Sequence, residues 1–247
     1  MSIEDALAAA LSELAAPAPS TLIDKVFGHW TAAPSRIGDV LVAFTGHGVH
    51  YLRPAGDPQG FAADYRARFG RPLRAADRAP AGVVPALRGT ARAPRPDLTG
   101  LSAFERDVLT ATRGIPAGQT RPYGWVAREA GHPGAVRAVG SVLARNPVPL
   151  LVPCHRVVRA DGAPGEYMFG ADRKAELLRD EGAPLDDVAE LARAGVHYLA
   201  SDTTGIVCFP TCRDARRITA VHRHGFRSVA AALDAGYRPC RTCRPAA

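Results

Sequence analysis

The sequence lacks two features that would place the chain in or across a membrane. No apolar run approaches the length of a membrane-spanning helix, and Glu4 and Asp5 stand where a secretory signal would need basic residues. The 24 glycines and 21 prolines stay below the proportion typical of low-complexity chains, whereas 47% of the 247 residues are hydrophobic. We therefore expect a globular, monomeric, cytoplasmic protein of one large or two to three small domains, with reduced thiols and no membrane partner.

Acidic residues are scarce in two stretches of this basic chain, which has a net charge of +7. Residues 113–159 hold seven arginines and a single acid, Glu129, and the residues from 190 onward hold nine arginines and four acids. A basic face without any ligand is common. Because both stretches also contain the cysteine motifs, the charge pattern favours a polyanionic partner such as a nucleic acid.

Cysteine is also scarce, and four of the five cysteines form two pairs near the end of the sequence. The pairs are Cys208-x3-Cys212 and Cys240-x2-Cys243. This spacing is typical of metal-binding pairs, and four thiolates suit one tetrahedral Zn²⁺. The three histidines of the same segment are rival ligands, but four cysteines already complete a closed site. A module of this size buries little apolar surface, so a metal would supply much of its stability.

The fifth cysteine has a different environment. Cys154 is followed directly by His155 in an apolar stretch bounded by prolines, which predicts an activated nucleophile. Upstream, two short helices are expected over residues 123–130 and 135–145, separated by Gly131-His-Pro-Gly134. Two helices across such a turn are typical of the helix-turn-helix motif, which docks its second helix on DNA.

The remaining elements follow from local patterns. Ser102 and Glu105 form a capping-box pattern that predicts a helix over residues 102–113. In the N-terminal part, an amphipathic stretch predicts a helix over residues 3–14, and residues 59–69 also read as helical. Alternating residues predict a hairpin of strands 39–44 and 49–52, and a proline-rich linker covers residues 91–97. No recognisable chemistry occurs in this part.

Residues 101–182 resemble the O6-alkylguanine-DNA alkyltransferases, which repair DNA by moving an alkyl group from guanine to their own cysteine. The resemblance rests on several segments in order: Arg137-Ala-Val-Gly140, Asn146-Pro-Val-Pro149, Pro153-Cys-His-Arg-Val157, Tyr167 and Arg173-Lys-Ala-Glu-Leu-Leu178 followed by Glu181. It implies an α/β N-terminal domain over residues 1–95. A mostly helical alkyltransferase domain with a helix-turn-helix would cover residues 96–188, and a small α+β zinc domain would cover residues 189–247.

The resemblance also implies catalytic roles. Cys154 would accept the alkyl group from O6-alkylguanine in double-stranded DNA, once per protein molecule, with O4-alkylthymine as a further candidate substrate. His155 would act as the base through a water molecule, Glu181 would orient His155, and Asn146 would hold the turn around the site. The expected contacts with DNA and with the extruded base come from six residues: Tyr123, Arg137, Arg145, Val157, Tyr167 and Met168.

Two segments depart from the family pattern around the expected base pocket. Pro122 stands where a serine is frequent, and Glu166-Tyr-Met-Phe-Gly170 replaces the usual Tyr-Arg-Trp-Gly. Met168 therefore removes a positive charge, while Phe169 keeps an aromatic ring. We expect repair of methyl lesions to survive these changes, and the tolerance of bulky alkyl groups to differ.

The end of the sequence resembles the metal-binding domain of the bacterial protein Ada, on residues 203–212 and 235–243. In that module the first cysteine accepts methyl groups from phosphotriesters, which would assign this role to Cys208. Phe209 replaces the usual arginine, and no regulator domain of the Ada type follows from the sequence. A second repair site and a purely structural or DNA-tethering zinc module therefore stay open as alternatives.

Two other functions compete with repair. A damage sensor would bind alkylated DNA without removing the alkyl group, but it would not need Cys154. A cysteine hydrolase would use the same cysteine, histidine and glutamate, but it would turn over repeatedly and would not need a basic helix pair. The stoichiometry of alkyl transfer separates the three functions.

Overall fold

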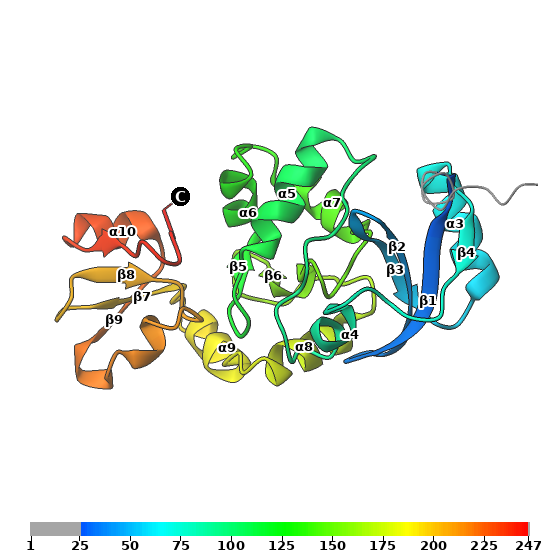
Figure 1. Ribbon diagram of the computed structural model, residues 1–247. Helices are drawn as coiled ribbons and strands as arrows, with labels where there is room; N and C mark the ends of the chain where they lie inside the picture. The colour runs from blue at the N-terminus through cyan, green and yellow to red at the C-terminus, as the bar shows by residue number, and fades with distance from the viewer. Residues whose placement is uncertain (1–25, 247) are drawn as a thin grey trace, which may run out of the picture.

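The structure is a computed structural model that describes residues 26–246 (Figure 1). The helix expected over residues 3–14 lies outside the described residues. A β-sheet lies at each end of the molecule, and a mostly helical region lies between the two sheets (Figure 1). Within residues 26–246, no helix is long and apolar enough to cross a membrane.

The N-terminal sheet contains four strands in the order β3-β2-β1-β4: β1 (Gly28–Ser35), β2 (Gly38–Thr45), β3 (Gly48–Pro54) and β4 (Leu73–Ala75). Strands β2 and β3 form the expected hairpin, whereas β1 and β4 lacked a clear pattern in the sequence. Strand β1 pairs antiparallel with β2 and parallel with β4. The sheet therefore extends beyond the hairpin that the sequence predicts.

Helix α3 (Pro58–Phe69) covers part of this sheet and matches the expected helix closely. It begins where the Asp57 side chain accepts a hydrogen bond from the Gly60 amide, and it ends at Gly70, whose φ of 67° suits glycine. Phe61 and Tyr65 of α3 pack into a cluster of buried side chains on the sheet. After the short helix α4 (Val83–Leu87), the proline-rich linker has no regular structure, as expected.

The central region contains five α-helices, one turn of 3-10 helix and a pair of very short strands within the described residues. The helices are α5 (Ala103–Arg113), α6 (Tyr123–Glu129), α7 (Val136–Ala144), α8 (Ala171–Asp180) and α9 (Leu185–Arg193). The 3-10 helix is η1 (Cys154–Arg156), and the strands are β5 (Arg121–Pro122) and β6 (Val157–Val158), which pair in parallel. The capping box at the start of α5 is present, which confirms that prediction.

Helices α6 and α7 form the expected helical pair across Gly131, whose φ is 79°. Pro122 ends strand β5 and precedes α6 as its N-cap residue. This position suits proline, which has no amide hydrogen to contribute to a helix. The strand pair β5–β6 thereby connects the start of α6 to the turn that contains Cys154.

The C-terminal sheet has the strand order β10-β8-β7-β9: β7 (Tyr198–Ser201), β8 (Ile206–Cys208), β9 (Arg223–Phe226) and β10 (Arg238–Pro239). Helix α10 (Val229–Asp234) lies between β9 and β10, before the second cysteine pair. The 3-10 turns η2 (Ala215–Arg217) and η3 (Ala220–His222) complete this region. One continuous cluster of buried side chains extends from the N-terminal sheet through the central helices to the cysteines of the C-terminal region.

Candidate active site and metal centre

A single asparagine organises the turn that carries Cys154. The Asn146 side chain, which is fully buried, donates hydrogen bonds to the Val152 carbonyl at 3.0 Å and to the Cys154 sulfur at 3.2 Å. Its oxygen accepts a hydrogen bond from the Val148 amide at 3.0 Å. The side chain therefore connects both ends of the turn and points a donor at the sulfur, where a thiolate needs one.

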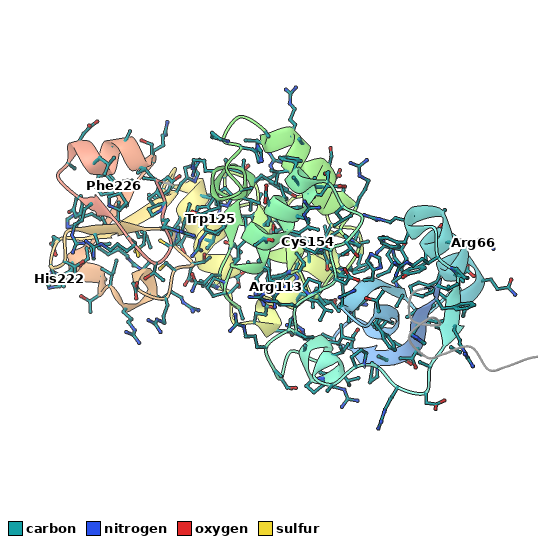
Figure 2. The ribbon with its side chains drawn as sticks, turned by 45° about the horizontal axis from the view of Figure 1, so that its top comes forward. Arg66, Arg113, Trp125, Cys154, His222 and Phe226 are labelled. Carbon is teal, nitrogen blue, oxygen red and sulfur yellow. The ribbon has the colours of Figure 1, made fainter. Side chains whose placement is uncertain are left out.

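Cys154 lies near the middle of the molecule and is 4% exposed (Figure 2). Burial raises the pKa of its thiol, while the hydrogen bond from Asn146 and the charge of Lys174 act in the opposite direction. The thiol form is thus favoured at rest. Formation of the reactive thiolate requires a base that removes the proton.

Lys174 on α8 is a charged group at this site that the sequence did not indicate. The side chain is 1% exposed, and Nζ donates to the Val157 carbonyl at 2.6 Å and more weakly to the Glu166 carbonyl at 3.4 Å. Burial lowers the lysine pKa to about 8, although negative charge on Cys154 opposes this shift. The only signal in the sequence is its position on the buried face of α8, together with two leucines.

The His155 ring reaches the end of α8, where Glu181 lies. Its Nε2 atom lies 3.0 Å from Oε1 of Glu181, and its Nδ1 atom is buried with no partner among the described residues. Burial lowers the pKa of His155, which favours the neutral ring, although Glu181 acts to raise it. Because an ionised carboxylate only accepts hydrogen bonds, Nε2 carries the proton and Nδ1 carries the free lone pair. The neutral ring can therefore accept a proton at Nδ1.

Glu181 follows directly after α8 and its side chain is 3% exposed. Arg36 donates to it at 2.9 Å, Arg156 donates to both of its oxygens at 2.8 and 2.9 Å, and the Gly118 amide donates at 3.3 Å. Burial alone would raise the pKa of the Glu181 carboxyl, but the hydrogen bonds and charges of His155 and Arg156 hold it well below its usual range. The carboxylate is therefore ionised whenever the protein is folded near neutral pH.

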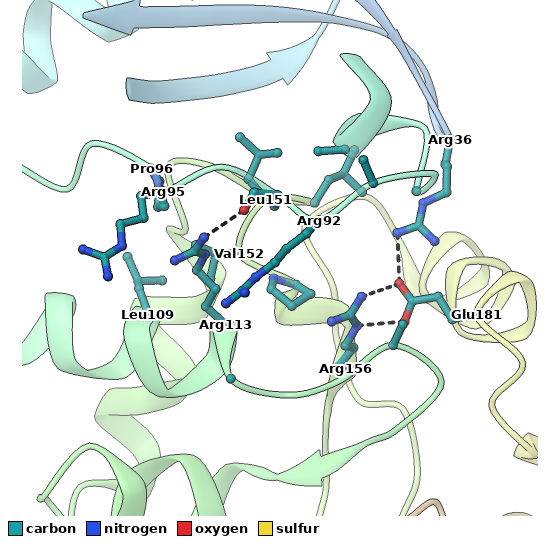
Figure 3. Close-up of a pocket in the computed structure, with 18 of the residues that line it drawn as sticks. Arg36, Arg92, Arg95, Pro96, Leu109, Arg113, Leu151, Val152, Arg156 and Glu181 are labelled. Carbon is teal, nitrogen blue, oxygen red and sulfur yellow. Dashed lines mark hydrogen bonds and ion pairs between the residues drawn. The ribbon is translucent and has the colours of Figure 1, made fainter. Parts of the chain in front are cut away.

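Figure 3 shows this ion cluster at the wall of a cavity of about 850 Å³. Arg36 follows strand β1 of the N-terminal sheet, and Arg156 belongs to η1, so the carboxylate joins two regions of the fold. Neither arginine could be assigned from the sequence, because their pairing with Glu181 depends on contacts far apart in the chain.

Two tyrosines and the segment 165–170 border the site. The Tyr167 ring packs edge-on against the His155 ring, with 6.2 Å between centroids, and edge-on against Phe169. Its hydroxyl is buried without a partner among the described residues. Tyr123 begins α6, is half-buried and lies close to Gly165. Burial raises the pKa of the Tyr123 and Tyr167 hydroxyls. Met168, in the segment 165–170, is half-buried.

Helix α7 carries the arginines that the sequence placed on a DNA-binding helix. Its buried face consists of Val139, Val142 and Leu143, and Arg137 in its first turn is exposed. Arg145 is the exposed C-cap residue, and its carbonyl accepts a hydrogen bond from Arg68 of α3. Within residues 26–246, neither arginine side chain hydrogen-bonds to the cluster around Cys154, and both are exposed to solvent.

The four remaining cysteines converge as the spacing predicts. The sulfur atoms of Cys208, Cys212, Cys240 and Cys243 all lie within 4.8 Å of one another, and all four residues are buried. Four soft thiolates at this spacing fit one tetrahedral Zn²⁺ with a closed coordination shell. Cys208 is 2% exposed, and the adjacent Phe209 is 5% exposed.

Comparison with known proteins follows the same division of the chain. The structure is similar to that of Mycobacterium tuberculosis OGT in complex with DNA, with 33% sequence identity and a TM-score of 0.51, over 65% of this chain and 98% of that one. The chain belongs to the O6-alkylguanine-DNA alkyltransferase family. Residues 103–183 match the family model of the 6-O-methylguanine DNA methyltransferase DNA-binding domain, and residues 190–246 match that of the metal binding domain of Ada.

Curated members of the alkyltransferase family match over shorter segments. The methylated-DNA–protein-cysteine methyltransferase of Salmonella typhimurium is 48% identical over 84 residues, 34% of this chain and 49% of that protein. The bifunctional transcriptional activator/DNA repair enzyme Ada of Escherichia coli is 36% identical over 163 residues, 62% of this chain and 45% of that protein. The chain therefore spans about half the length of the curated relatives that it matches.

The structure of this alkyltransferase-family chain brings four of the expected site residues together: Asn146, Cys154, His155 and Glu181. The Val157 carbonyl, which was expected to face the base, already accepts from Lys174, although a carbonyl oxygen has a second lone pair.

Proposed function

We propose that this protein repairs alkylated DNA by a single irreversible transfer of the alkyl group from O6-alkylguanine to Cys154. The main support is a series of three neighbouring groups. These are the buried Cys154 thiol, a neutral His155 with a free lone pair at Nδ1, and an ionised Glu181 that fixes the ring orientation. A histidine held in one tautomer by a carboxylate is the arrangement that activates other nucleophiles.

In the proposed reaction, His155 takes the thiol proton at Nδ1 through one bridging water. The Cys154 thiolate attacks the alkyl carbon, so that a sulfur–carbon bond forms and the carbon–O6 bond breaks. The electron pair stays on the guanine oxygen. His155 then passes the proton that it took from the thiol to the guanine anion, so that guanine and the imidazole ring are both neutral again. No group regenerates the thiol, because the thioether product is stable, and each molecule therefore acts once. Lys174 stabilises the thiolate by its positive charge.

Double-stranded DNA is the proposed partner, and its alkylated guanine must leave the stack, because Cys154 is almost completely buried. We propose that α7 docks on the duplex and that Arg137 fills the gap left by the base, while Arg145 contacts the backbone. Tyr123, Tyr167, Met168 and the Val157 carbonyl would contact the base. The exposure of both arginines and the position of Tyr123 and Tyr167 near the thiol support these roles.

We propose three domains: 1–95, 96–188 and 189–247. In the C-terminal domain, Zn²⁺ held by the four cysteines would fix the fold and keep every sulfur in the thiolate form. The burial of Cys208 and of the adjacent Phe209 favours a structural role for this centre over a second alkyl acceptor that reaches a DNA backbone. A methylphosphotriester would reach Cys208 only after this region opens.

Mass spectrometry of the intact protein after incubation with a duplex containing O6-methylguanine tests the proposal. We expect one added methyl group in the wild type and in Cys208→Ala, and none in Cys154→Ala. A protein that binds the lesion without any mass change would be a sensor. Repeated turnover with an unmodified protein would indicate a hydrolase. A methyl group on Cys208 after incubation with phosphotriester DNA would show that Cys208 is a second alkyl acceptor.

A further inference from the structure

Arg121 is a fully buried arginine between the central region and the C-terminal metal centre. It forms strand β5 with Pro122, and the whole residue is 1% exposed. Its guanidinium donates to the Gln119 side chain and to the Thr120 carbonyl, both at 2.7 Å, while Nε has no partner. All of these acceptors are neutral. In residues 26–246, no carboxylate forms an ion pair with Arg121.

Two aromatic rings lie near the guanidinium, one from the central region and one from the C-terminal region. The guanidinium carbon lies 5.2 Å from the centroid of the Phe209 ring and 5.6 Å from that of the Trp125 ring. Trp125 belongs to α6, whereas Phe209 follows the metal ligand Cys208 directly. Aromatic rings attract a cation only modestly, so they do not replace a counter-ion for a charge removed from water. A buried guanidinium with neutral partners is unfavourable unless a negative charge lies nearby.

The four-cysteine centre supplies that negative charge. Four thiolates around one Zn²⁺ carry a net charge of about −2. The sulfur atoms of all four cysteines lie close enough to Arg121 to act electrostatically on its guanidinium. The centre is also buried, so that its own excess negative charge needs a cation in the same low-dielectric environment. Each group therefore balances the other.

The hydrogen bonds around this charge pair connect the same two parts of the protein. Trp125 Nε1 donates to the carbonyl of the metal ligand Cys243 at 3.0 Å. The Thr120 amide donates to the Thr211 hydroxyl at 2.9 Å, and that hydroxyl lies 3.2 Å from the Thr120 carbonyl. Thr211 precedes the ligand Cys212. Every one of these contacts therefore reaches a metal ligand or its immediate neighbour in the sequence.

We infer that Arg121 is the counter-ion of the C-terminal metal centre, and that this buried charge pair docks the metal-binding module on α6 of the alkyltransferase domain. The inference goes beyond alkyl transfer, because the pair would form whether or not Cys154 reacts. It also makes the stability of the interface depend on the metal, since loss of Zn²⁺ and protonation of the thiols would leave the guanidinium buried without a counter-ion.

The strand pair β5–β6 connects this interface to the active site. Arg121 pairs with Val157 in the β5–β6 ladder, and Val157 follows η1, which contains Cys154. On the other side of β5, Tyr123 begins α6. A loosened Arg121 would therefore loosen both the turn that holds the thiol and the start of the helix that holds Tyr123.

The inference is tested by zinc competition with a chromophoric chelator on three variants of the full chain. Arg121→Met keeps the length and apolar stem of the side chain without its charge, and we expect it to raise the zinc Kd at least tenfold. Arg121→Lys keeps the charge, and we expect it to recover at least half of that loss on a logarithmic scale. Trp125→Phe removes an interface hydrogen bond but no charge, and we expect a zinc Kd within threefold of wild type.

Equal zinc affinity in Arg121→Met and wild type would overturn the inference. So would an equal loss in Arg121→Met and Arg121→Lys, or an equal loss in Trp125→Phe, because each would assign the effect to packing rather than to charge. None of these measurements involves alkyl transfer, so their failure is distinguishable from failure of the proposed repair function.

Hydrogen exchange on the wild-type chain provides a test that does not depend on any variant folding. After removal of zinc by chelation, we expect amide protection to fall at least tenfold at residues 119–121 and 123 as well as in the C-terminal module. Helix α3, far from the interface, serves as the internal control and should keep its protection. Unchanged protection of residues 119–121 and 123 in a protein whose C-terminal module has lost its zinc would refute docking by the charge pair.

Discussion

Substitution of Glu181 by glutamine probes the ion cluster that fixes the orientation of His155. Glutamine keeps the shape of the side chain but replaces one acceptor oxygen by an NH₂ donor, which then faces donors of Arg36, Arg156 or His155. Both arginines lose their counter-ion while they are only 15–16% exposed. Removal of one partner from a buried charge pair costs about 3–5 kcal/mol. We expect Glu181→Gln to lower the free energy of unfolding by about 3 kcal/mol at pH 7.

Glu176→Gln is the matched control, because Glu176 lies on the same helix α8 and also accepts from an arginine at 2.8 Å. That pair is about half exposed, and exposed pairs contribute less than about 1 kcal/mol. Urea unfolding of both variants measures the contrast. Equal losses in the two variants would refute the conclusion that burial makes the Glu181 cluster important.

The pH dependence of this difference has a defined direction. The folded-state pKa of Glu181 is lowered, so its stabilisation is fully present above the unfolded pKa of about 4.3 and is lost as the pH falls toward the folded value. We therefore expect the stability difference between wild type and Glu181→Gln to be constant from pH 6 to 7 and to shrink below about pH 4. A difference that grows with acidity would contradict the assignment. The alkyl-transfer rate of the same variant should fall about a hundredfold.

Three further substitutions test separate parts of the site. Lys174→Met removes the cation near Cys154, so we expect the midpoint of the pH–rate profile for alkyl transfer to move to higher pH; an unchanged midpoint would exclude this electrostatic role. Asn146→Ala removes three buried hydrogen bonds and should lower the unfolding free energy by about 2–4 kcal/mol, measured by urea denaturation. Arg137→Ala should slow repair of duplex DNA at least tenfold and leave the reaction with free O6-benzylguanine within twofold, and equal effects on both substrates would place Arg137 elsewhere.

Local sequence patterns predicted the helices with clear boundaries. The capping box at Ser102 and the glycine-containing turn at Gly131 determine α5 and the α6–α7 pair through contacts within a few residues. Strand β1 was missed because its mixed polar and apolar residues gain their order from pairing with β2 and β4. That pairing depends on tertiary structure and leaves little periodicity in the sequence.

The same distinction applies to the site. Cys154 and His155 are adjacent in the sequence, and the spacing of the other four cysteines is typical of a metal site. The thiol–histidine pair and the metal site could therefore both be found from the sequence. Arg36 and Arg121 could not be found from the sequence, because their roles depend on burial and on partners far away along the chain. An arginine is most often a surface residue, and only the structure reveals which arginines are buried with a charge.

The most direct test of the account measures the transfer of a tritiated methyl group from O6-methylguanine in duplex DNA, followed by peptide mapping of the protein. The account predicts one label per protein molecule, located on the peptide that contains Cys154, and no transfer with Cys154→Ser although that variant still binds the duplex. Label on any other residue, or release of more than one methyl group per protein molecule, would contradict it.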